Sequence, residues 1–429
     1  MIHPFSDVSA FRRDPLNFLI ERGTKATEPL VRMRLGPSAV YLVTDPELIK
    51  PLLKMDVGEA GKGRLIHKLR PIIGMSSLLL HGEEHRRRRA ILHEHLARGN
   101  VEKYLPQISA EIRAVGARLA RTGQFNPHEA TATLALRIIC IAVFGKQVLT
   151  SGDEQALVAA VRYVEDDMAD EMFRALPPGP VTWIRRRRRR SFAKLAMSVV
   201  VDRLRKGAAR TSALCDLEAL GLDADELRDE ILTLLLAGHH TTGSTAAWIL
   251  YHMAAEPGLM DRLADEANRA TDSNGEICAE GLKHATESLA LVREALRLYP
   301  AAWWFSREIN KHMEFGARKL SPGTSLIISP WQLHRDPRYW DDPTAFRLDR
   351  TFTSKAYLPF GAGPRACVGM GVAMLELQLL ALEIAATYRF GSVVPYPAPL
   401  PKPSVTLIPP EMHIEISLRE SVGVRRSAA

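Results

Sequence analysis

One stretch of this 429-residue chain is more informative than any other, Phe360-Gly361-Ala362-Gly363-Pro364-Arg365-Ala366-Cys367-Val368-Gly369. Three glycines and a proline within ten residues exclude a regular helix or strand interior, so the stretch predicts a tight loop. An apolar, helix-forming run follows at residues 372–386. We therefore expect the thiol of Cys367 just ahead of a helix N-terminus, where the helix dipole and free N–H groups favour a thiolate.

A thiolate held by backbone amides beside an aromatic residue suits a haem iron, which needs a soft, anionic axial ligand. The stretch resembles the haem-binding loop of the cytochrome P-450 family. The pattern of that loop, Phe-x-x-Gly-x-Arg-x-Cys-x-Gly, is matched at Phe360, Gly363, Arg365, Cys367 and Gly369. The resemblance implies haem b (iron protoporphyrin IX), with Cys367 as the axial ligand of the iron. The plainer interpretation, a buried and inert core thiol, fits most isolated cysteines but not one in such a loop.

The composition of the chain is that of an ordinary globular protein. The chain is 46% hydrophobic and 25% charged, as in ordinary globular proteins. Its four cysteines have no metal-finger or disulfide-framework spacing, which favours a reducing compartment. Residues 1–7 contain no hydrophobic run, so we expect neither a signal peptide nor a membrane anchor. Together with the resemblance, this indicates a bacterial, cytoplasmic member that receives electrons from a separate ferredoxin-type donor and its reductase.

The sharpest charge run is Arg185 to Arg190, in a chain with a net charge of +8. Such a run fits a nucleic-acid or anionic-surface patch. We favour the solvated start of a helix, because the run follows the helix-breaking residues 176–180 and leads into a helical pattern from Phe192. No nucleic-acid partner is expected. An all-arginine first turn would oppose the helix dipole, a conflict that the sequence leaves open.

Helical spacing dominates the middle of the chain, and short strands are expected near both ends. Helices are predicted at residues 46–53, 85–96, 101–120, 126–144, 153–172, 191–205, 223–254 and 283–298, and a mobile loop at 57–80. Strands are predicted at residues 31–35, 40–43, 313–315 and 325–329, with 404–407 and 413–418 forming a closing pair. The fold class is mainly α with a small β part (α+β). The resemblance implies the cytochrome P-450 fold, and residues 1–429 form one domain in our interpretation.

The longest helical run contains Leu234 to Ser244, an apolar segment that nevertheless carries two histidines and two threonines. It resembles the central helix of the family, Ala-Gly-x-Asp/Glu-Thr, which implies that Thr241 supports proton delivery to bound O2. The plainer role of Thr241 is a hydroxyl bonded within its own helix. His240 occupies the acidic position, as in some sterol-demethylase members. We hypothesise that His240 substitutes for the acid, since an imidazole can relay protons near neutral pH.

Two sets of charged residues complete the resemblance. Glu294-x-x-Arg297 is by itself an ordinary helix ion pair, but residues 346–350 resemble the Phe-x-Pro-x-Arg segment of the family, with Leu348 replacing proline. This implies a structural, non-catalytic cluster of Glu294, Arg297 and Arg350.

Haem propionates are anions that need cations. His85 and Arg89 share one helix face, and with Arg307 and Arg365 they are the candidates, while Phe360 would contact the haem. The alternative for each charged residue is an exposed surface charge. Arg86, Arg87 and Arg88 are expected to line a surface that attracts the acidic electron donor.

The resulting interpretation is a haem-thiolate monooxygenase that inserts one oxygen atom from O2 into a small lipophilic substrate such as a terpenoid, steroid or fatty acid. A peroxygenase or isomerase that needs no external electrons stays open, as does a non-catalytic haem-binding sensor. The regions expected to touch substrate are residues 57–80, 164–183, 301–305, the central helix near Leu235 and Ala237, and the hairpin near Ile408. The acidic residues between 165 and 171 are expected on a solvated helix face.

Overall fold

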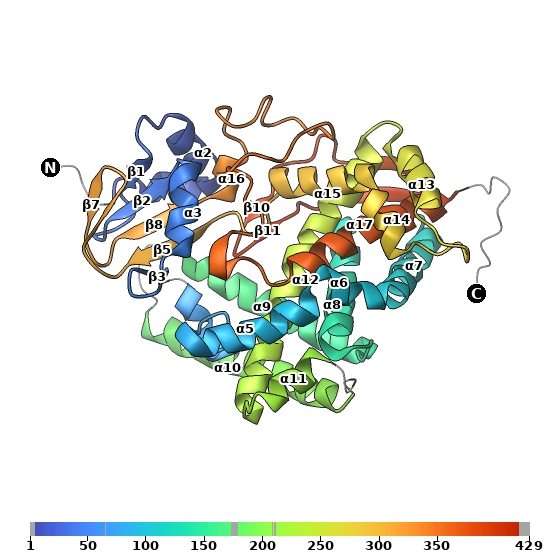
Figure 1. The fold of residues 1–429 in the computed structure, drawn as a ribbon, viewed down its shortest axis with the longest axis horizontal. Helices are drawn as coiled ribbons and strands as arrows, with labels where there is room; N and C mark the ends of the chain where they lie inside the picture. Colours follow the sequence, from blue (N-terminus) through green and yellow to red (C-terminus); the bar gives the residue numbers. More distant parts are fainter. Residues whose placement is uncertain (1–4, 65, 173–178, 208, 210–211, 420–429) are drawn as a thin grey trace.

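The computed structural model describes residues 5–64, 66–172, 179–207, 209 and 212–419 (Figure 1). A β-rich part, built from blue and orange segments, lies beside a larger helical body (Figure 1). The predicted class, mainly α with a small β part, is confirmed.

The largest sheet joins the two ends of the chain. Its strand order is β1-β2-β8-β5-β3, formed by β1 (Leu30–Met33), β2 (Val40–Val43), β8 (Ser325–Ile328), β5 (Phe305–Ile309) and β3 (Ala60–Lys62). The predicted hairpin is present as β1 and β2, and β2 runs parallel to β8. The strands β3 and β5, which periodicity did not indicate, pair antiparallel with Lys62 opposite Arg307. This register brings two cations from distant segments to one place.

The expected pairing of residues 404–407 with 413–418 is wrong. Residues 402–408 form their own tight hairpin, β10 (Lys402–Pro403) with β11 (Leu407–Ile408). The strand β12 (His413–Leu418) pairs instead with β9 (Tyr388–Val394) and β4 (Gln124–Phe125). The alternating side chains Ile414 and Ile416 are buried in the core of the helical body, which explains why β12 lies there. A small hairpin of β6 (Met313–Phe315) and β7 (Arg318–Leu320) completes the β structure.

The helices account for most of the described residues. In chain order they are α1 (Val8–Arg13), α2 (Pro15–Thr24), α3 (Pro46–Lys54), η1 (Ile66–Leu69), α4 (Arg70–Ile73), α5 (Gly82–Leu96), α6 (Arg98–Val101), η2 (Glu102–Tyr104), α7 (Leu105–Thr122), α8 (Pro127–Phe144), α9 (Ser151–Met172), α10 (Pro180–Gly207), α11 (Ala213–Ala219), α12 (Ala224–Ala255), α13 (Leu259–Arg269), α14 (Ala279–His284), α15 (Thr286–Leu298), α16 (Pro330–Leu333), η3 (Gly363–Arg365) and α17 (Met370–Thr387). Residues 57–80, expected to be a loop, thus contain β3, η1 and α4.

Local capping signals explain why several helices begin where they do. Asp45 and Asn126 each accept a hydrogen bond from a first-turn N–H of α3 and α8, and both helices open with proline. Asp223 and Glu226 form a capping box at the start of α12. Such contacts lie within a few residues along the chain, so these boundaries were predictable.

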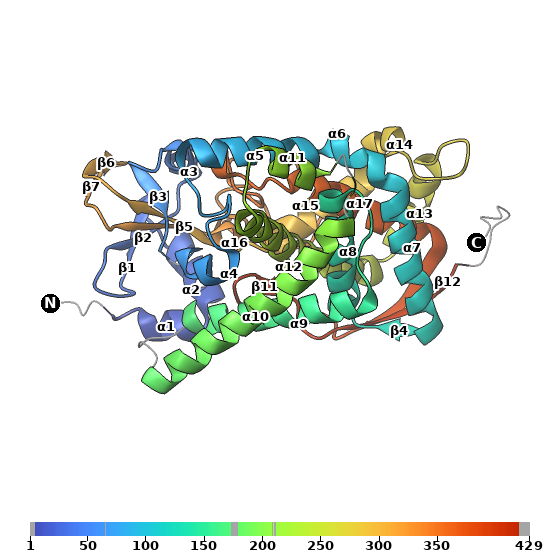
Figure 2. The same ribbon diagram turned by 90° about the horizontal axis from the view of Figure 1, so that it is seen from below.

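The 32-residue helix α12 is the central element, and it is seen nearly end-on at the centre of Figure 2. It crosses α8 closely: Thr131 Oγ1 of α8 donates a hydrogen bond to the carbonyl of Gly243 at 2.8 Å. A Cβ atom on Gly243 would lie 3.1 Å from Ala132 Cα, and one on Gly238 would lie 2.7 Å from Ile139 Cγ1. Glycine is therefore required at this crossing for packing.

Two helices, α8 and α17, are long and apolar enough to cross a membrane by length and composition. Most of each is buried inside the protein, 72% of α8 and 67% of α17. They are best explained as core helices, since both contribute buried side chains to the main hydrophobic cluster.

The arginine run does not start a helix, contrary to the expectation from the sequence. Helix α10 begins at Pro180, so Arg185 to Arg190 lie beyond its first turn and the conflict with the helix dipole disappears. Arg186 and Arg190 form ion pairs with Asp167 of α9, which is buried. The prediction of a solvated acidic face on α9 is therefore wrong for Asp167.

Candidate functional site

The loop around Cys367 turns sharply, as its glycines predict. Gly361 and Gly363 have φ values of 66° and 73°, in the left-handed region that favours glycine. The N–H of Cys367 donates to the carbonyl of Phe360 at 2.9 Å, which closes the loop. Helix α17 then begins at Met370, so the thiol does lie just ahead of a helix N-terminus.

The thiol of Cys367 opens into a cavity of about 530 Å³ between this loop, α12 and the β3–β5 edge of the large sheet. Phe360, Arg365, Arg307 and Thr241 line the same cavity. The residue is accessible because it faces the cavity, although it lies deep among protein atoms. Five of the predicted site residues thus meet around one space.

Burial raises the pKa of the Cys367 thiol above its ordinary value, although the Gly369 N–H and the Arg89 guanidinium act in the opposite direction. The expected depression of the thiol pKa by the helix N-terminus is therefore outweighed by desolvation. A bound metal cation removes the proton from a coordinating thiol. The protein thus holds the thiol ready for a metal and does not itself ionise it.

Cations gather at one end of the cavity. Lys62 and Arg307 face each other across β3 and β5, and Arg365 and Arg89 lie nearby. Burial and the neighbouring guanidinium groups lower the pKa of Lys62 to about 7. Burial also lowers the pKa of Arg307 and, with the neighbouring arginines, brings the pKa of Arg365 to about 10.

Within the described part of the chain, these four cations form no ion pair with an acid. Arg365 donates to the carbonyl of Leu80 at 2.6 Å, Arg89 to that of Ala366 at 2.6 Å, and Lys62 to that of Leu78. A partly buried group of mutually repelling cations fits a ligand that carries carboxylates. The residues present thus fit a haem, with a thiol for its iron and cations for its propionates.

His85 and Arg89 do not line the cavity as the other predicted residues do. Arg89 holds the backbone beside Cys367 through Ala366, and it lies close enough to influence the thiol pKa. His85 is buried, and burial together with Arg365 and Arg89 lowers its pKa to about 4. Arg89 belongs to the same cationic group, whereas His85, with a pKa of about 4, is neutral at pH 7.

On the side of the cavity formed by α12, Thr241 donates its hydroxyl to the carbonyl of Ala237 at 2.6 Å. His240 Nδ1 lies 2.8 Å from Glu165 Oε2 of α9, an ion-pair distance at which the two groups are not aligned as a hydrogen bond. Glu165 lines the cavity and is buried, so its expected position on a solvated face is wrong. His239 is fully buried, and both of its ring nitrogens lack a hydrogen-bond partner in the described structure. His240, and not His239, therefore meets an acid.

Glu376 is a buried carboxyl group in the wall of the cavity, on the first turns of α17. Burial raises its pKa to about 8, so the carboxyl group is mainly protonated at neutral pH. An acid inside the apolar run 372–386 was a signal that could have identified this residue. Lys62 and Glu165 gave no such signal, because the first lies in an aperiodic segment and the second in an acidic run.

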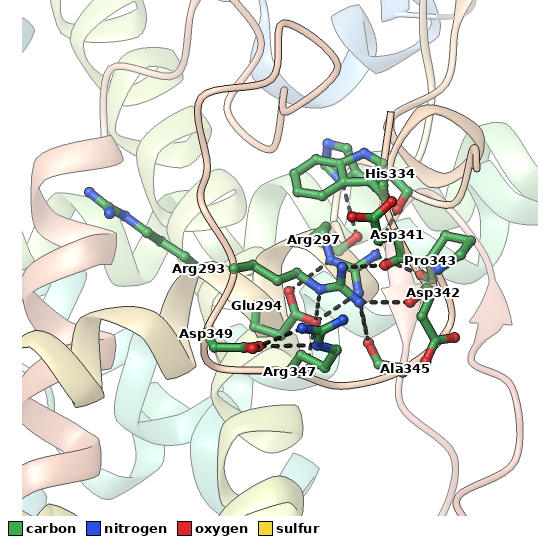
Figure 3. Close-up of polar contacts among 12 residues, drawn as sticks. Arg293, Glu294, Arg297, His334, Asp341, Asp342, Pro343, Ala345, Arg347 and Asp349 are labelled. Atoms are coloured by element: carbon green, nitrogen blue, oxygen red, sulfur yellow. Dashed lines mark hydrogen bonds and ion pairs between the residues drawn. The ribbon is translucent and has the colours of Figure 1, made fainter. Parts of the chain in front are cut away.

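The cluster of Glu294, Arg297 and Arg350 is not part of the cavity lining. Figure 3 shows Glu294 and Arg297 of α15 beside Pro343 and Ala345. Arg297 donates two hydrogen bonds of 2.7 Å to Glu294, and Arg350 Nε donates to the same carboxylate at 3.0 Å. Arg297 also donates to the carbonyls of His334, Pro343 and Ala345. Glu294 and Arg297 are fully buried, so the cluster fixes backbone segments in place.

The three arginines expected along a donor-facing surface separate into two groups. Arg86 and Arg87 are exposed and pair with Glu83 and Glu84 of their own helix. Arg88 is buried, against expectation, because it forms ion pairs with Glu226 and Glu230 of α12 as well as with Glu84. It joins α5 to α12.

Each region predicted to touch substrate contributes residues to the cavity wall, although some of the individual residues named do not line it. Lining residues are Ile66, Leu69, Ile73, Leu78, Val164, Met168, Leu234, Leu236, Ala237, Ala301, Ala302, Trp304, Phe305, Val405 and Thr406. Leu235 and Ile408 do not line it. Trp303 is fully buried and donates its indole N–H to the carbonyl of Ser404, so it packs the core. Residues 173–178 of the predicted region lie outside the described residues.

Comparisons with known proteins agree with this geometry. The family model described as Cytochrome P450 matches residues 8–416. Cyclooctatin synthase of Streptomyces melanosporofaciens is 30% identical over 92% of this chain and 89% of that protein. From the same organism, cyclooctat-9-en-7-ol 5-monooxygenase is 28% identical over 90% of this chain and 87% of that protein. Pentalenene oxygenase of Streptomyces avermitilis is 26% identical over 88% of this chain and 87% of that protein.

A crystal structure of CYP175A1 from Thermus thermophillus has the same fold, with a TM-score of 0.77, 24% identity, and coverage of 96% of this chain and 97% of that one. The chain belongs to the cytochrome P450 family and is a cytochrome P450 monooxygenase. Family membership implies a haem-thiolate centre that uses O2.

Proposed function

We propose that this chain, acting as a single domain, inserts one oxygen atom from O2 into a terpenoid. The observation that carries the proposal is one cavity that combines the Cys367 thiol, an apolar wall and a group of cations without acidic partners among the described residues. Relatives at 28% and 26% identity are named as a monooxygenase and an oxygenase of terpenoid compounds, which favours a terpenoid over a steroid or a fatty acid. Electrons would come from a separate ferredoxin-type donor and its reductase in a bacterial cytoplasm.

The cofactor that fits the cavity is haem b, which supplies the activation of O2 when it is bound. Cys367 Sγ would be the ligand of its iron, with Phe360 beside it. The propionates would lie among Arg307, Arg365 and Lys62. Arg89 would add to the positive potential, and His85, which is neutral at pH 7 because its pKa is about 4, would serve a propionate only as a hydrogen-bond donor.

The proton path that we propose runs along the α12 side of the cavity. Glu165 Oε2 and His240 Nδ1 lie 2.8 Å apart, so a small rotation that aligns them as a hydrogen bond would let a proton pass between them. The Thr241 hydroxyl lies one residue further along α12. For Thr241 to donate toward the cavity, its hydroxyl must leave the carbonyl of Ala237. A carboxylate and an imidazole suit such a relay, because an imidazole can take up and release a proton near neutral pH.

An optical titration of the purified ferric protein with diterpenoids, steroids and fatty acids tests the substrate class. We expect a saturable low-spin to high-spin shift with terpenoids, and ¹⁸O from ¹⁸O₂ in the product when a ferredoxin and its reductase are supplied. A shift with steroids or fatty acids alone would overturn the terpenoid assignment. Product formed from peroxide but not from reduced ferredoxin would assign a peroxygenase. Haem binding without turnover under any of these conditions would assign a sensor.

A further inference from the structure

Helix α10 carries an apolar face that no described part of the chain covers. Val181, Ile184, Phe192, Leu195 and Val199 are exposed by 46% to 73% of their surface. Their spacing of 3, 8, 3 and 4 residues places them on one side of a helix with 3.6 residues per turn. We name these five residues the α10 stripe. Figure 2 shows α10 lying diagonally across the outside of the helical body, beside α9.

The opposite side of α10 holds the helix to the protein. Arg186 and Arg190 pair with Asp167 of α9, and Lys194 Nζ lies 3.0 Å from Asp229 Oδ1 of α12. Ala193, Met197 and Val201 are buried against the core. The stripe is therefore the outward face of a firmly packed helix.

Cations flank the stripe. Arg185, Arg188 and Arg189 are exposed, and they form no ion pair with any residue that the structure describes. Arg188 falls within the stripe itself, between Ile184 and Phe192. A helix with large apolar side chains on one face and arginines beside them has the composition of helices that lie in a membrane interface.

The charge of α10 indicates which kind of partner binds this face. Its sequence contains ten Lys and Arg residues and one acid, Asp202. A second copy of the chain seated on the stripe would bring two strongly cationic helices together, which is unfavourable. An anionic lipid surface instead offers phosphate groups to the guanidinium groups and acyl chains to the apolar side chains.

We propose that the α10 stripe docks the protein reversibly on an anionic lipid bilayer. The apolar side chains enter the boundary between headgroups and acyl chains, while Arg185, Arg188 and Arg189 bind lipid phosphates. Helix α9 precedes α10 in the chain and lines the cavity through Val161, Val164 and Met168. Docking would bring that edge of the cavity near a membrane in which a lipophilic substrate dissolves. This last link rests on the proposed function, whereas the docking itself does not.

Co-sedimentation of the haem-loaded protein with vesicles tests docking without substrate or turnover. We expect binding to vesicles of phosphatidylcholine with phosphatidylglycerol, weak binding to phosphatidylcholine alone, and a decline as salt is raised. R185Q/R188Q should weaken the partition roughly 30-fold, since each basic residue contributes roughly fivefold at an anionic surface. F192S/L195S should also release the protein.

Matched controls separate the stripe from general charge and hydrophobicity. R118Q/R121Q removes two exposed arginines at the same spacing from α7, and V394S/L400S removes two exposed apolar side chains elsewhere. Both should bind vesicles as the unmodified protein does. Equal loss in the controls, or no binding to anionic vesicles, would overturn the proposal. A concentration-dependent dimer in light scattering that F192S/L195S abolishes would assign the stripe to a second copy.

Discussion

Glu165 Oε2 of α9 lies 2.8 Å from His240 Nδ1 of α12. The two side chains are about one-tenth exposed, and Glu165 borders the cavity that also holds Thr241 and Cys367. The acidic group that α12 lacks at position 240 is thus supplied by α9.

We expect His240→Ala and Glu165→Gln to lower product formation by roughly 10²-fold and to divert electrons to peroxide, because either change breaks the proton path. The measurement is product and peroxide per NAD(P)H consumed. His239→Leu is the matched control, since His239 is buried beside His240 and has no polar partner to lose within the described residues. Unchanged coupling in both variants, or an equal loss in the control, would exclude the relay.

Glu376 makes the stability of the protein depend on pH. Its pKa is raised from 4.5 to about 8 in the folded state, so its ionisation disfavours the fold progressively as pH rises through this range. Relative to the unmodified protein, Glu376→Gln should gain about 2.5 kcal/mol in unfolding free energy between pH 5 and pH 7, at about 1.36 kcal/mol per pH unit. Denaturant unfolding at several pH values measures the difference. A difference that does not change with pH would contradict the buried, protonated carboxyl group.

Arg297→Met should destabilise the protein by about 3–5 kcal/mol, because it leaves Glu294 with a buried charge that Arg350 alone compensates. Thermal and denaturant unfolding of the haem-loaded protein provide the measurement. Arg86→Met removes an exposed pair with Glu83 at the same i,i+3 spacing and should cost less than about 0.5 kcal/mol. Similar costs for the two variants would show that the cluster is not a structural anchor.

Lys62→Met should speed the loss of haem to an acceptor such as apomyoglobin by about tenfold, since a charged hydrogen bond to a propionate contributes roughly 1.5 kcal/mol or more. Lys54→Met, at an exposed lysine in α3, is the control and should retain haem normally. In the haem-free protein the loss of one cation should also raise the pKa of His85, which Lys62 helps to depress. Equal haem retention in the two variants would remove Lys62 from the propionate site.

Most of the long helices were predictable from the sequence, and the predictions that failed did so for physical reasons. The starts of α3, α8 and α12 follow from capping residues that act within one turn. The start of helix α10 was predicted too late because residues 176–180 were interpreted as helix-breaking, whereas Pro180 opens the helix, a position that proline tolerates. The pairing of β12 was wrong because strand partners are selected by burial of Ile414 and Ile416 against distant helices.

The sequence by itself determined the loop that presents Cys367, because glycine and proline restrict backbone angles locally whatever surrounds them. It also determined the family. Only the tertiary structure decided that Lys62 stands opposite Arg307, that Glu165 meets His240, and that Arg88 is buried. These relationships join residues far apart in the chain, and they depend on which faces of packed elements become buried, which no local pattern encodes.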